Sequence, residues 1–274
     1  MKPFLRILIL LTLAVSLLGC GNRKSSPTED NVVSAAPLPK SGGVTDDGPR
    51  VNIPDSEFRN YLLSEVAYSV IPFEQGKSVA GVKLYDTVYV PTEQRIDSNG
   101  DGEISIAEAE QVLFLKVGGL GVKSLEGLES FPNLVGLVVN GVDSLRLDLS
   151  NNPKLKHLDC RKCDLAALDL SKNPDLKVLY CRGNQLSALD LANNIALTRL
   201  DCANNQISAL DLSNNVALEY ADCSSNQLST LDVSKNRCLT ALYCDYNPLK
   251  TLCVAVGQTF GHMSIPEDTA IVNK

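Results

Sequence analysis

Residues 168–188, LDLSKNPDLKVLYCRGNQLSA, decide the fold, because the chain repeats this stretch with constant spacing. Aligned on the first leucine, successive units begin at Leu147, Leu168, Leu189, Leu210 and Leu231, every 21 residues. A weaker unit at 125–146 is one residue longer, and a fragment from Val112 precedes it. Such a short period predicts a solenoid, in which each repeat is one turn that contacts only its neighbours.

Apolar and polar residues alternate in the middle of each unit. Leu179 and Cys181 alternate with Val178, Tyr180 and Arg182, the pattern of a strand with one buried face. One unit is too short to bury that face alone, so neighbouring strands must stack in parallel, about 4.8 Å apart. The rest of the unit contains Asp, Asn and Pro where a helix needs good helix formers. We expect turns or a second short strand there.

Each unit carries the phrase L-x-x-L-x-C-x-x-N-x-L, which in one copy falls at Leu176, Leu179, Cys181, Asn184 and Leu186. This phrase resembles the leucine-rich repeat. The resemblance implies a leucine-rich repeat solenoid with a parallel β-sheet on the concave side and turns or short strands on the convex side. We place the repeats at 118–252, a small mixed α/β N-terminal cap at 51–117 and a C-terminal cap at 253–274, because stacked repeats leave apolar ends.

Two columns of buried side chains follow from the period. The first holds Asn184, Asn205, Asn226 and Asn247, with Cys163 in that place in the first full repeat. We expect these amides to point inward and to bind the backbone of adjacent turns. The second column holds Cys160, Cys181, Cys202, Cys223 and Cys244. Their even spacing favours small buried hydrophobes over disulfides or a zinc site, because metal ligands cluster around one point. The redox state of Cys163, Cys238 and Cys253 does not follow from the sequence.

A third column consists of carboxylates, Asp148, Asp169, Asp190, Asp211 and Asp232. If each accepts hydrogen bonds from turn amides and faces water, their repulsion is tolerable. The alternative is a row of calcium ions that bridges the turns. We favour the first interpretation, because one Asp per turn supplies too few oxygen ligands.

The N-terminus has the pattern of a secretion signal. Lys2 and Arg6 precede an apolar run of twelve residues at 7–18, too short to span a bilayer, which needs about 20. The ending Leu-Leu-Gly-Cys resembles a bacterial lipobox, which implies a lipoprotein signal peptide at 1–19 and a lipid anchor on Cys20. The alternative is an ordinary signal peptide with a chance cysteine. By resemblance to the usual lipoprotein sorting rule, Gly21 after the cysteine implies the outer membrane, without showing which side the domain faces. Residues 20–50, rich in Pro, Gly and Ser, predict a disordered tether.

Residues 97–108, DSNGDGEISIAE, match the calcium-loop pattern D-x-[DN]-x-[DN]-G-x5-E. The predicted calcium ligands are Asp97, Asn99, Asp101, Glu103, Ser105 and Glu108, of which Glu103 acts through its backbone carbonyl and Ser105 through water. The alternative is a solvated acidic turn. A lone loop of this kind predicts a rigid staple for the cap, with Ca²⁺ bound outside the cell.

Two helices should flank this loop, at 55–66, where Asp55 can cap the first turn, and at 105–115. The first helix does not run directly into the loop, since strand-like sequence at 67–96 lies between, and we assign that insertion no role. The order of lipobox, tether, helix, calcium loop and repeats resembles the leucine-rich repeat lipoproteins of bacterial cell envelopes, with internalin-like repeats.

The outward positions of the strands offer a binding surface. We predict that a protein or peptide partner contacts the concave sheet through His157, Asp159, Arg161, Tyr180, Arg182, Arg199, Asp201, Tyr220, Asp222 and Tyr243. Tyrosine and arginine are enriched among the residues that dominate binding energy. The alternative is a sheet face that is merely solvated.

These observations favour a non-enzymatic, envelope-anchored binding protein, an adhesin or receptor. A structural envelope protein is the alternative, and a hydrolase is the least expected, because neither G-x-S-x-G nor H-E-x-x-H occurs and His157 and Cys160 point to opposite faces of one strand. We therefore predict no catalytic residues. A net charge of -7 without a basic patch argues against nucleic acid. We expect a monomer.

Overall fold

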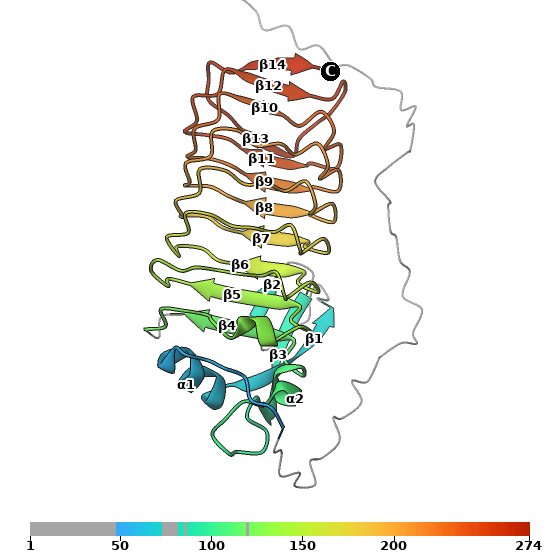
Figure 1. Cartoon of the computed structure of the whole chain (residues 1–274). Helices are drawn as coiled ribbons and strands as arrows, with labels where there is room; N and C mark the ends of the chain where they lie inside the picture. The colour runs from blue at the N-terminus through green and yellow to red at the C-terminus, as the bar shows by residue number, and fades with distance from the viewer. Residues whose placement is uncertain (1–47, 73–81, 85–86, 119–120) are drawn as a thin grey trace, which may run out of the picture.

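The protein is an elongated solenoid with a small α/β cap at its N-terminal end (Figure 1). The computed structural model describes residues 48–72, 82–84, 87–118 and 121–274. The predicted fold class, stacked parallel strands with little helix, is confirmed. Within the described residues, no helix is both long and apolar enough to cross a membrane.

The main sheet lines one side of the solenoid and has the strand order β13-β11-β9-β8-β7-β6-β5-β4. Its strands, from the N-terminal end, are β4 (Phe114–Gly118), β5 (Gly136–Asn140), β6 (His157–Asp159), β7 (Val178–Tyr180), β8 (Arg199–Asp201), β9 (Tyr220–Asp222), β11 (Ala241–Tyr243) and β13 (His262–Ser264). All neighbours are parallel and in register, so that Leu158 pairs with Leu179 and Leu179 with Leu200. These central leucines are fully buried, which places the residues on either side of them on the outer face.

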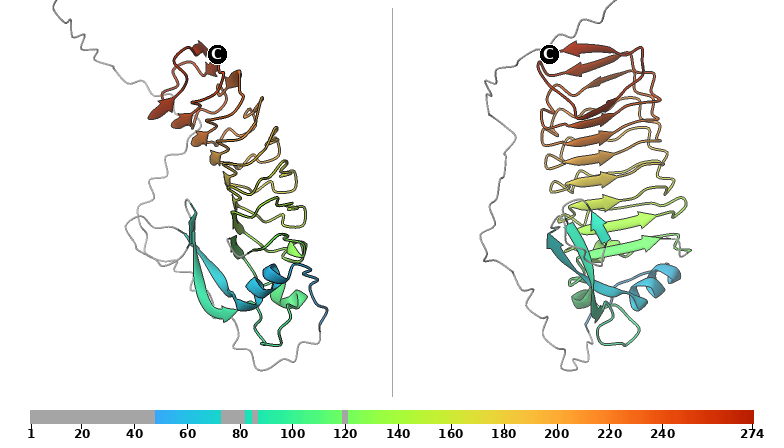
Figure 2. Two further views of the ribbon diagram at one scale, coloured as in Figure 1. Left: turned by 90° about the vertical axis from the view of Figure 1, so that its left-hand side faces the viewer. Right: turned by 180° about the vertical axis from the view of Figure 1, so that it is seen from behind.

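The return side of the solenoid is mostly turns, as expected. A second parallel sheet forms only near the C-terminus, from β10 (Thr230–Asp232), β12 (Thr251–Val254) and β14 (Ala270–Asn273). One short 3-10 helix, η1 (Leu128–Ser130), lies near the other end. The side with the main sheet is the concave one, because the solenoid bends toward it (Figure 2, left).

The predicted asparagine column tightens successive turns. The Asn205 side chain accepts from the Leu186 amide (3.1 Å) and donates to the carbonyls of Cys181 and Cys202 (both 3.0 Å). Asn184, Asn226 and Asn247 bind in the same way. Each side chain therefore joins two neighbouring turns by hydrogen bonds, which satisfies backbone groups that the short strands leave unpaired.

The cap begins with helix α1 (Ser56–Ser64), close to the predicted helix at 55–66. The Asp55 carboxylate caps it by accepting from the amides of Glu57 (3.0 Å) and Phe58 (2.9 Å). A three-stranded antiparallel sheet in the order β1-β3-β2 follows, with strands β1 (Val66–Pro72), β2 (Val82–Leu84) and β3 (Thr87–Arg95). Most of this sheet is the insertion for which the sequence suggested no role.

The helix predicted at 105–115 is wrong beyond its first turn. Helix α2 covers only Ile106–Ala109, and β4 starts at Phe114. The capping box between Ser105 and Glu108 starts the helix as expected. The chain then turns, because Phe114 and Val117 are buried in the first strand of the main sheet, which pairs with β5. Tertiary packing thus overrides local helix propensity here.

Candidate binding surface and calcium loop

The outer face of the main sheet carries the predicted binding residues in in-register columns. One column runs through His157, Val178, Arg199, Tyr220 and Ala241, and its neighbour runs through Asp159, Tyr180, Asp201, Asp222 and Tyr243. Because the strands are parallel and unshifted, residues of one column stand side by side along the solenoid. The predicted clustering of these residues on one face therefore follows from the observed register.

Several residues in the N-terminal half of this face are buried. His157 and Asp159 are 2% exposed and Val178 is fully buried. Contact of His157 and Asp159 with a partner stays a prediction, and it requires that these residues become exposed. The sheet β1-β3-β2 stands on this side of the first repeats, and β1 contacts β4 (Figure 2). The described strands of the insertion thus lie on the side of the solenoid where the sequence predicted the binding surface.

Asp159 is held by an ion pair at the edge of the buried region. Arg161 donates through Nε (2.8 Å) to one carboxylate oxygen and through its terminal nitrogen (2.6 Å) to the other. Hydrogen-bond partners orient the Asn140 amide so that its nitrogen lies 3.0 Å from Asp159 Oδ1. The Arg161 guanidinium also lies 5.5 Å from the centre of the Tyr180 ring. Asp159 and Arg161 therefore stabilise each other.

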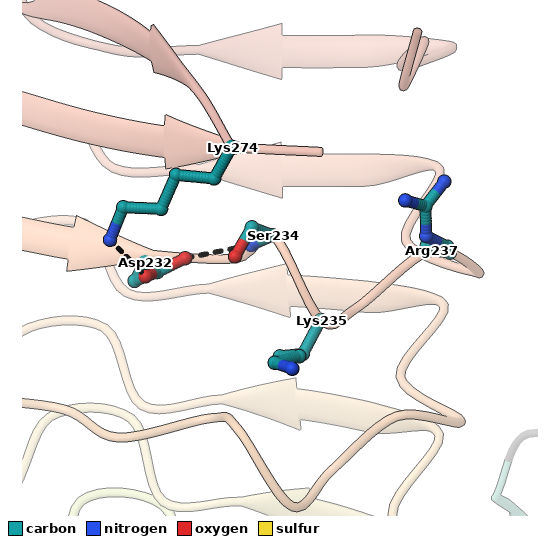
Figure 3. A pocket seen from close by; sticks show the side chains of 5 residues that line it. All are labelled: Asp232, Ser234, Lys235, Arg237 and Lys274. Atoms are coloured by element: carbon teal, nitrogen blue, oxygen red, sulfur yellow. Dashed lines mark hydrogen bonds and ion pairs between the residues drawn. The ribbon is translucent and has the colours of Figure 1, made fainter. Parts of the chain in front are cut away.

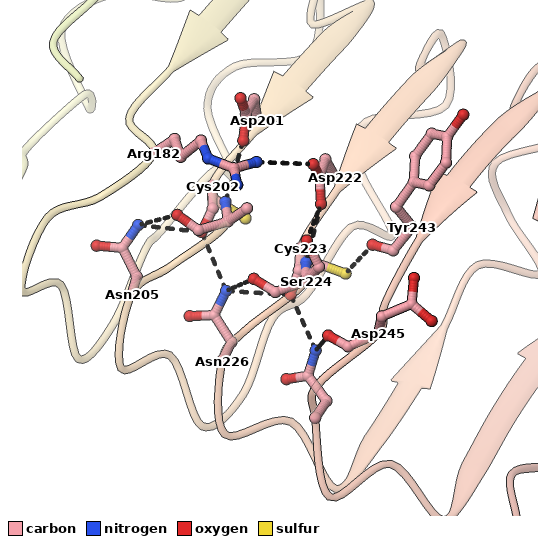
Figure 4. A network of polar contacts seen from close by, with 12 residues as sticks. Arg182, Asp201, Cys202, Asn205, Asp222, Cys223, Ser224, Asn226, Tyr243 and Asp245 are labelled. Carbon is pink, nitrogen blue, oxygen red and sulfur yellow. Dashed lines mark hydrogen bonds and ion pairs between the residues drawn. The ribbon is translucent and has the colours of Figure 1, made fainter. Parts of the chain in front are cut away.

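Strands β8, β9 and β11 carry the open half, where the predicted residues reach the surface. The Arg199 guanidinium lies 4.3 Å above the Tyr220 ring, and the Tyr220 and Tyr243 rings are 5.8 Å apart and tilted. Arg182 lies 3.4 Å from Asp222 (Figure 4). Apart from Asp222, these side chains are about half-buried, so they are partly ordered by their neighbours yet accessible.

The central acidic residues of the open half have an unusual electrostatic environment. Asp201 and Asp222 stand directly side by side in register. Burial, and then the neighbouring Asp222 carboxylate, raise the pKa of Asp201 above 3.8. The positive charge of Arg182 lowers this pKa, but by less. Burial and the same carboxylates raise the pKa of Tyr220 to about 12, so this tyrosine keeps its proton at neutral pH.

Asn204 is a member of this surface that the sequence did not suggest. With the amide oriented by its hydrogen-bond partners, its oxygen accepts from Arg182 Nη2 at 2.9 Å and from Arg182 Nε at 3.1 Å. Asn204 has a φ of 54°, a left-handed conformation that asparagine tolerates better than most residues. The sequence shows only that an asparagine follows Ala203 in this repeat. Its contact with Arg182 depends on how neighbouring turns stack, which is seen in the structure.

The cysteine column is buried and free of disulfides. Cys160, Cys181, Cys202, Cys223 and Cys244 are all buried free thiols, and so is Cys163, while Cys253 is a half-buried free thiol. Burial raises the pKa of Cys160, Cys181 and Cys202 well above 9.0, which disfavours reactive thiolates. The Cys163 thiol donates to the Val139 carbonyl (3.1 Å), a weak bond where later repeats have asparagine. These thiols act as packing groups.

The aspartate column lies on the return side and caps turns. The carboxylates of Asp148, Asp169, Asp190, Asp211 and Asp232 each accept from the backbone amide two residues later. These bonds hold the pKa of Asp148, Asp169 and Asp211 below 3.8. At the last member, Lys274 Nζ lies 2.6 Å from Asp232, beside a hollow that Ser234, Lys235 and Arg237 also line (Figure 3). The turn-capping interpretation accounts for each carboxylate.

The calcium-loop residues lie together between β3 and α2, but they mostly bind one another and the backbone. The Asp97 carboxylate accepts from the amides of Gly100 (2.7 Å) and Gly102 (3.2 Å). One Glu108 oxygen accepts from the Ser98 amide (2.8 Å) and the other from the Ser105 amide (3.0 Å). These hydrogen bonds fix the conformation of the loop.

Two neighbouring groups bind the Asp101 carboxylate. Arg50 pairs with it at 2.8 Å, and the Asn99 side chain donates to it at 3.1 Å. In the described part of the chain, no three His, Cys, Asp or Glu side chains are close enough to share a metal ion. The match of the loop to the calcium motif therefore stays a prediction.

Cys20, the predicted lipidation site, lies outside the described residues. The signal peptide and nearly the whole predicted tether lie there as well, so the structure carries no information on the anchor.

Comparisons with known proteins support the fold. No family model and no curated protein matches the chain. Among solved structures, internalin C2 from Listeria monocytogenes is 18% identical, with a TM-score of 0.53, and the match covers 82% of this chain and 97% of that one. The leucine-rich repeat domain of APL1B is 20% identical, with a TM-score of 0.51, and covers 62% of this chain and 53% of that one.

A third match is the functional domain of InlJ from Listeria monocytogenes, which includes a cysteine ladder. It is 23% identical with a TM-score of 0.35, and covers 56% of this chain and 51% of that one. The chain thus spans about half the length of InlJ's domain and of the APL1B domain. At these identities the likeness concerns the fold alone. With the observed register and repeat, the likeness to internalin C2 and to the APL1B domain shows that this chain has the fold of a leucine-rich repeat solenoid.

Proposed function

We propose that the chain is a non-enzymatic binding protein that holds a protein or peptide partner on the open half of its concave sheet. The observation that carries this proposal is the half-buried cluster of Arg199, Tyr220 and Tyr243 on three neighbouring strands. Their rings and guanidinium group are ordered by one another, so little side-chain entropy is lost when a partner covers them. Arg182 and Asp222 add polar groups at the side of the cluster.

We further propose that the protein works at the bacterial outer membrane, as an adhesin or receptor anchored through lipid on Cys20. This rests on the lipobox-like sequence alone. Intact-mass measurement of the protein extracted from membranes tests it directly. A mass without the acyl chains would contradict the anchor, and it would leave the binding surface untouched, because the two features lie in different parts of the chain.

The binding surface is tested by capture from envelope and extracellular extracts with immobilised residues 48–274. This segment contains the whole hydrophobic core, from Val51 to Val254. We expect the wild-type bait to retain a partner that a variant with Arg199→Ala, Tyr220→Ala and Tyr243→Ala loses. The matched control carries Ile195→Ala and Val216→Ala, which remove exposed apolar groups outside the outer-face columns, and should bind like the wild type.

Equal capture by all three baits would mean that any partner binds outside the cluster of Arg199, Tyr220 and Tyr243. A structural role in the envelope would then be the better interpretation.

We retain calcium binding as a proposal that rests on the motif and on the left-handed φ of Gly100 (74°) and Gly102 (83°), the conformation of a sharp turn. If Ca²⁺ displaces Arg50 from Asp101, millimolar calcium should raise the melting temperature of the wild type. Calcium should not change the melting temperature of the Asp97→Asn, Glu108→Gln variant. An equal melting temperature of the wild type with calcium and with chelator would mean that the loop is only an acidic turn.

A further inference from the structure

Tyr246 is an exposed aromatic residue that packing does not explain. It is 84% exposed, more than any other large hydrophobic residue in the part of the chain that the structure describes. It follows β11, and the turn that contains β13 stacks on β11. Tyr246 therefore does not lie in the last turn, and its exposure does not depend on where the chain ends.

The backbone at Tyr246 does not suit an aromatic side chain either. Its φ of 55° lies in the left-handed region, which glycine adopts freely and a bulky residue adopts only at a cost in conformational energy. The equivalent positions of the preceding repeats share this conformation and hold Lys162, Gly183, Asn204 and Ser225. Because neither the core nor the backbone favours a tyrosine here, we look to the surface around it for a role.

Two tyrosines on the outer face of the main sheet each hold a guanidinium group from the preceding turn. Arg161 lies 5.5 Å from the centre of the Tyr180 ring, and Arg199 lies 4.3 Å from the centre of the Tyr220 ring. The face of an aromatic ring carries negative charge density, which attracts a cation. The sheet thus uses the same contact at two places.

The next two tyrosines have no such cation. Among the described residues, no lysine or arginine lies over the ring of Tyr243 or Tyr246, and Tyr243 contacts only the Tyr220 ring, at 5.8 Å. The outer-face positions on and just after β9 and β11 contain no basic residue and hold Tyr220, Asp222, Ser224, Ala241, Tyr243 and Asp245. The described chain therefore leaves the last two rings open to a cation from outside.

The carboxylate beside these rings also lacks a basic partner. Asp245 follows Tyr243 by two residues, so both side chains lie on the outer face (Figure 4). No hydrogen bond or ion pair within the described residues engages the Asp245 carboxylate. On the neighbouring strand, Asp222 has Arg182 at 3.4 Å. The surface of Tyr243, Asp245 and Tyr246 is thus aromatic and acidic, which is complementary to a positively charged group.

We propose that a basic segment of the protein partner binds here, with an arginine or lysine side chain against the rings of Tyr243 and Tyr246 and its charge beside Asp245. This inference rests on the proposed binding function and adds the chemistry of the partner. The partner's cation takes the role that Arg161 and Arg199 have at the preceding tyrosines. Arginine fits better than lysine, because a planar guanidinium stacks on a ring while its nitrogens donate to a carboxylate.

Three acetylated peptide amides, Ser-Arg-Ser, Ser-Lys-Ser and Ser-citrulline-Ser, serve as probes of this surface. Each is titrated into the purified protein and followed by NMR at the backbone amides of residues 243–246. Citrulline resembles arginine in shape and carries no charge. We expect the arginine and lysine peptides to shift these amides and the citrulline peptide to leave them unchanged. High salt should weaken the binding, because it screens an exposed ion pair.

Two variants separate binding from folding. Tyr246→Gly removes the ring and relaxes the left-handed backbone, so it should melt at no lower temperature than the wild type. It should nevertheless weaken binding of the arginine peptide by more than about fivefold, and Asp245→Asn should act similarly. The control Gln227→Ala changes an exposed side chain of the preceding repeat and should bind the peptide like the wild type.

The outcomes distinguish this inference from the proposed function. Absence of any shift, equal shifts with the citrulline peptide, or undiminished binding by Tyr246→Gly would overturn the inference. In the capture experiment, a bait with Tyr246→Gly and Asp245→Asn should lose the partner. If that bait retains the partner while the variant of Arg199, Tyr220 and Tyr243 loses it, the basic segment is wrong and the binding function stands. Retention by both baits contradicts the binding function itself.

Discussion

The two halves of the concave sheet have the same register but opposite exposure. On β6 and β7 the outer-face residues His157 and Val178 are buried, while in the same column Arg199 and Tyr220 on β8 and β9 reach the surface. The strands do not explain the difference, since they are equally parallel and equally spaced. The sheet β1-β3-β2 lies beside the first half only (Figure 2). Residues at equivalent positions of successive repeats therefore differ in environment. The segments packed against them decide whether they are accessible to a partner.

The largest expected effect comes from a charge placed in the same column of each half. Val178→Asp should lower the free energy of unfolding by about 3 kcal/mol, because it places a carboxylate at a fully buried position whose neighbour Arg199 already stacks on Tyr220. Ala241→Asp, at a half-buried position of the open half, should change it by less than about 1 kcal/mol. Urea denaturation of the two variants measures both values.

Equal effects of Val178→Asp and Ala241→Asp would mean that the covering of the first half does not persist in solution. A truncation control is unsuitable, because removing β1–β3 would also interrupt the chain between α1 and α2.

Repeats made most of the fold predictable from the sequence. Leu158, Leu179 and Leu200 share one environment, so a period of 21 residues fixes strand, register and buried face together. The asparagine column was predictable for the same reason. The period did not predict that His157 and Asp159 are buried, and the sheet β1-β3-β2, which stands on the same side of the solenoid, comes from a segment that does not repeat. The prediction that Phe114 belongs to a helix failed because this residue forms a strand by pairing with β5. That pairing joins distant parts of the chain, so the local sequence does not reveal it.

The ion pairs of the two halves should differ in strength. Asp159 and Arg161 make two short contacts, of 2.8 and 2.6 Å, and the Asp159 side chain is 3% exposed. Asp222 and Arg182 make one contact of 3.4 Å, with the Asp222 side chain 12% exposed. A double-mutant cycle with alanine should give a coupling energy of about 1–2 kcal/mol for the first pair and less than about 0.5 kcal/mol for the second. A larger coupling in the open half would contradict the assigned difference in burial.

A pH-dependent difference should appear only in the open half, at Asp201. Folding raises the pKa of this carboxyl, so its contribution to stability is full below the ordinary value of 3.8 and is lost as the pH rises through the raised value. Asp201→Asn removes that loss and should melt at a higher temperature than the wild type at neutral pH. The difference should shrink toward zero below pH 3.8. A variant that is less stable at neutral pH would show that the carboxylate is compensated by Arg182.

A small effect on stability should come from Arg199 and Tyr220, and it distinguishes mutual ordering of the two side chains from a role in partner binding. Their 4.3 Å contact is partly exposed, so a double-mutant cycle with Arg199→Ala and Tyr220→Ala should give a coupling energy of about 0.5 kcal/mol in unfolding. If the pair is held ready for a partner, the same two changes should weaken capture much more than they weaken the fold, because the partner covers both groups and removes water from them. Loss of capture in proportion to lost stability would instead show that the pair only supports its own strand.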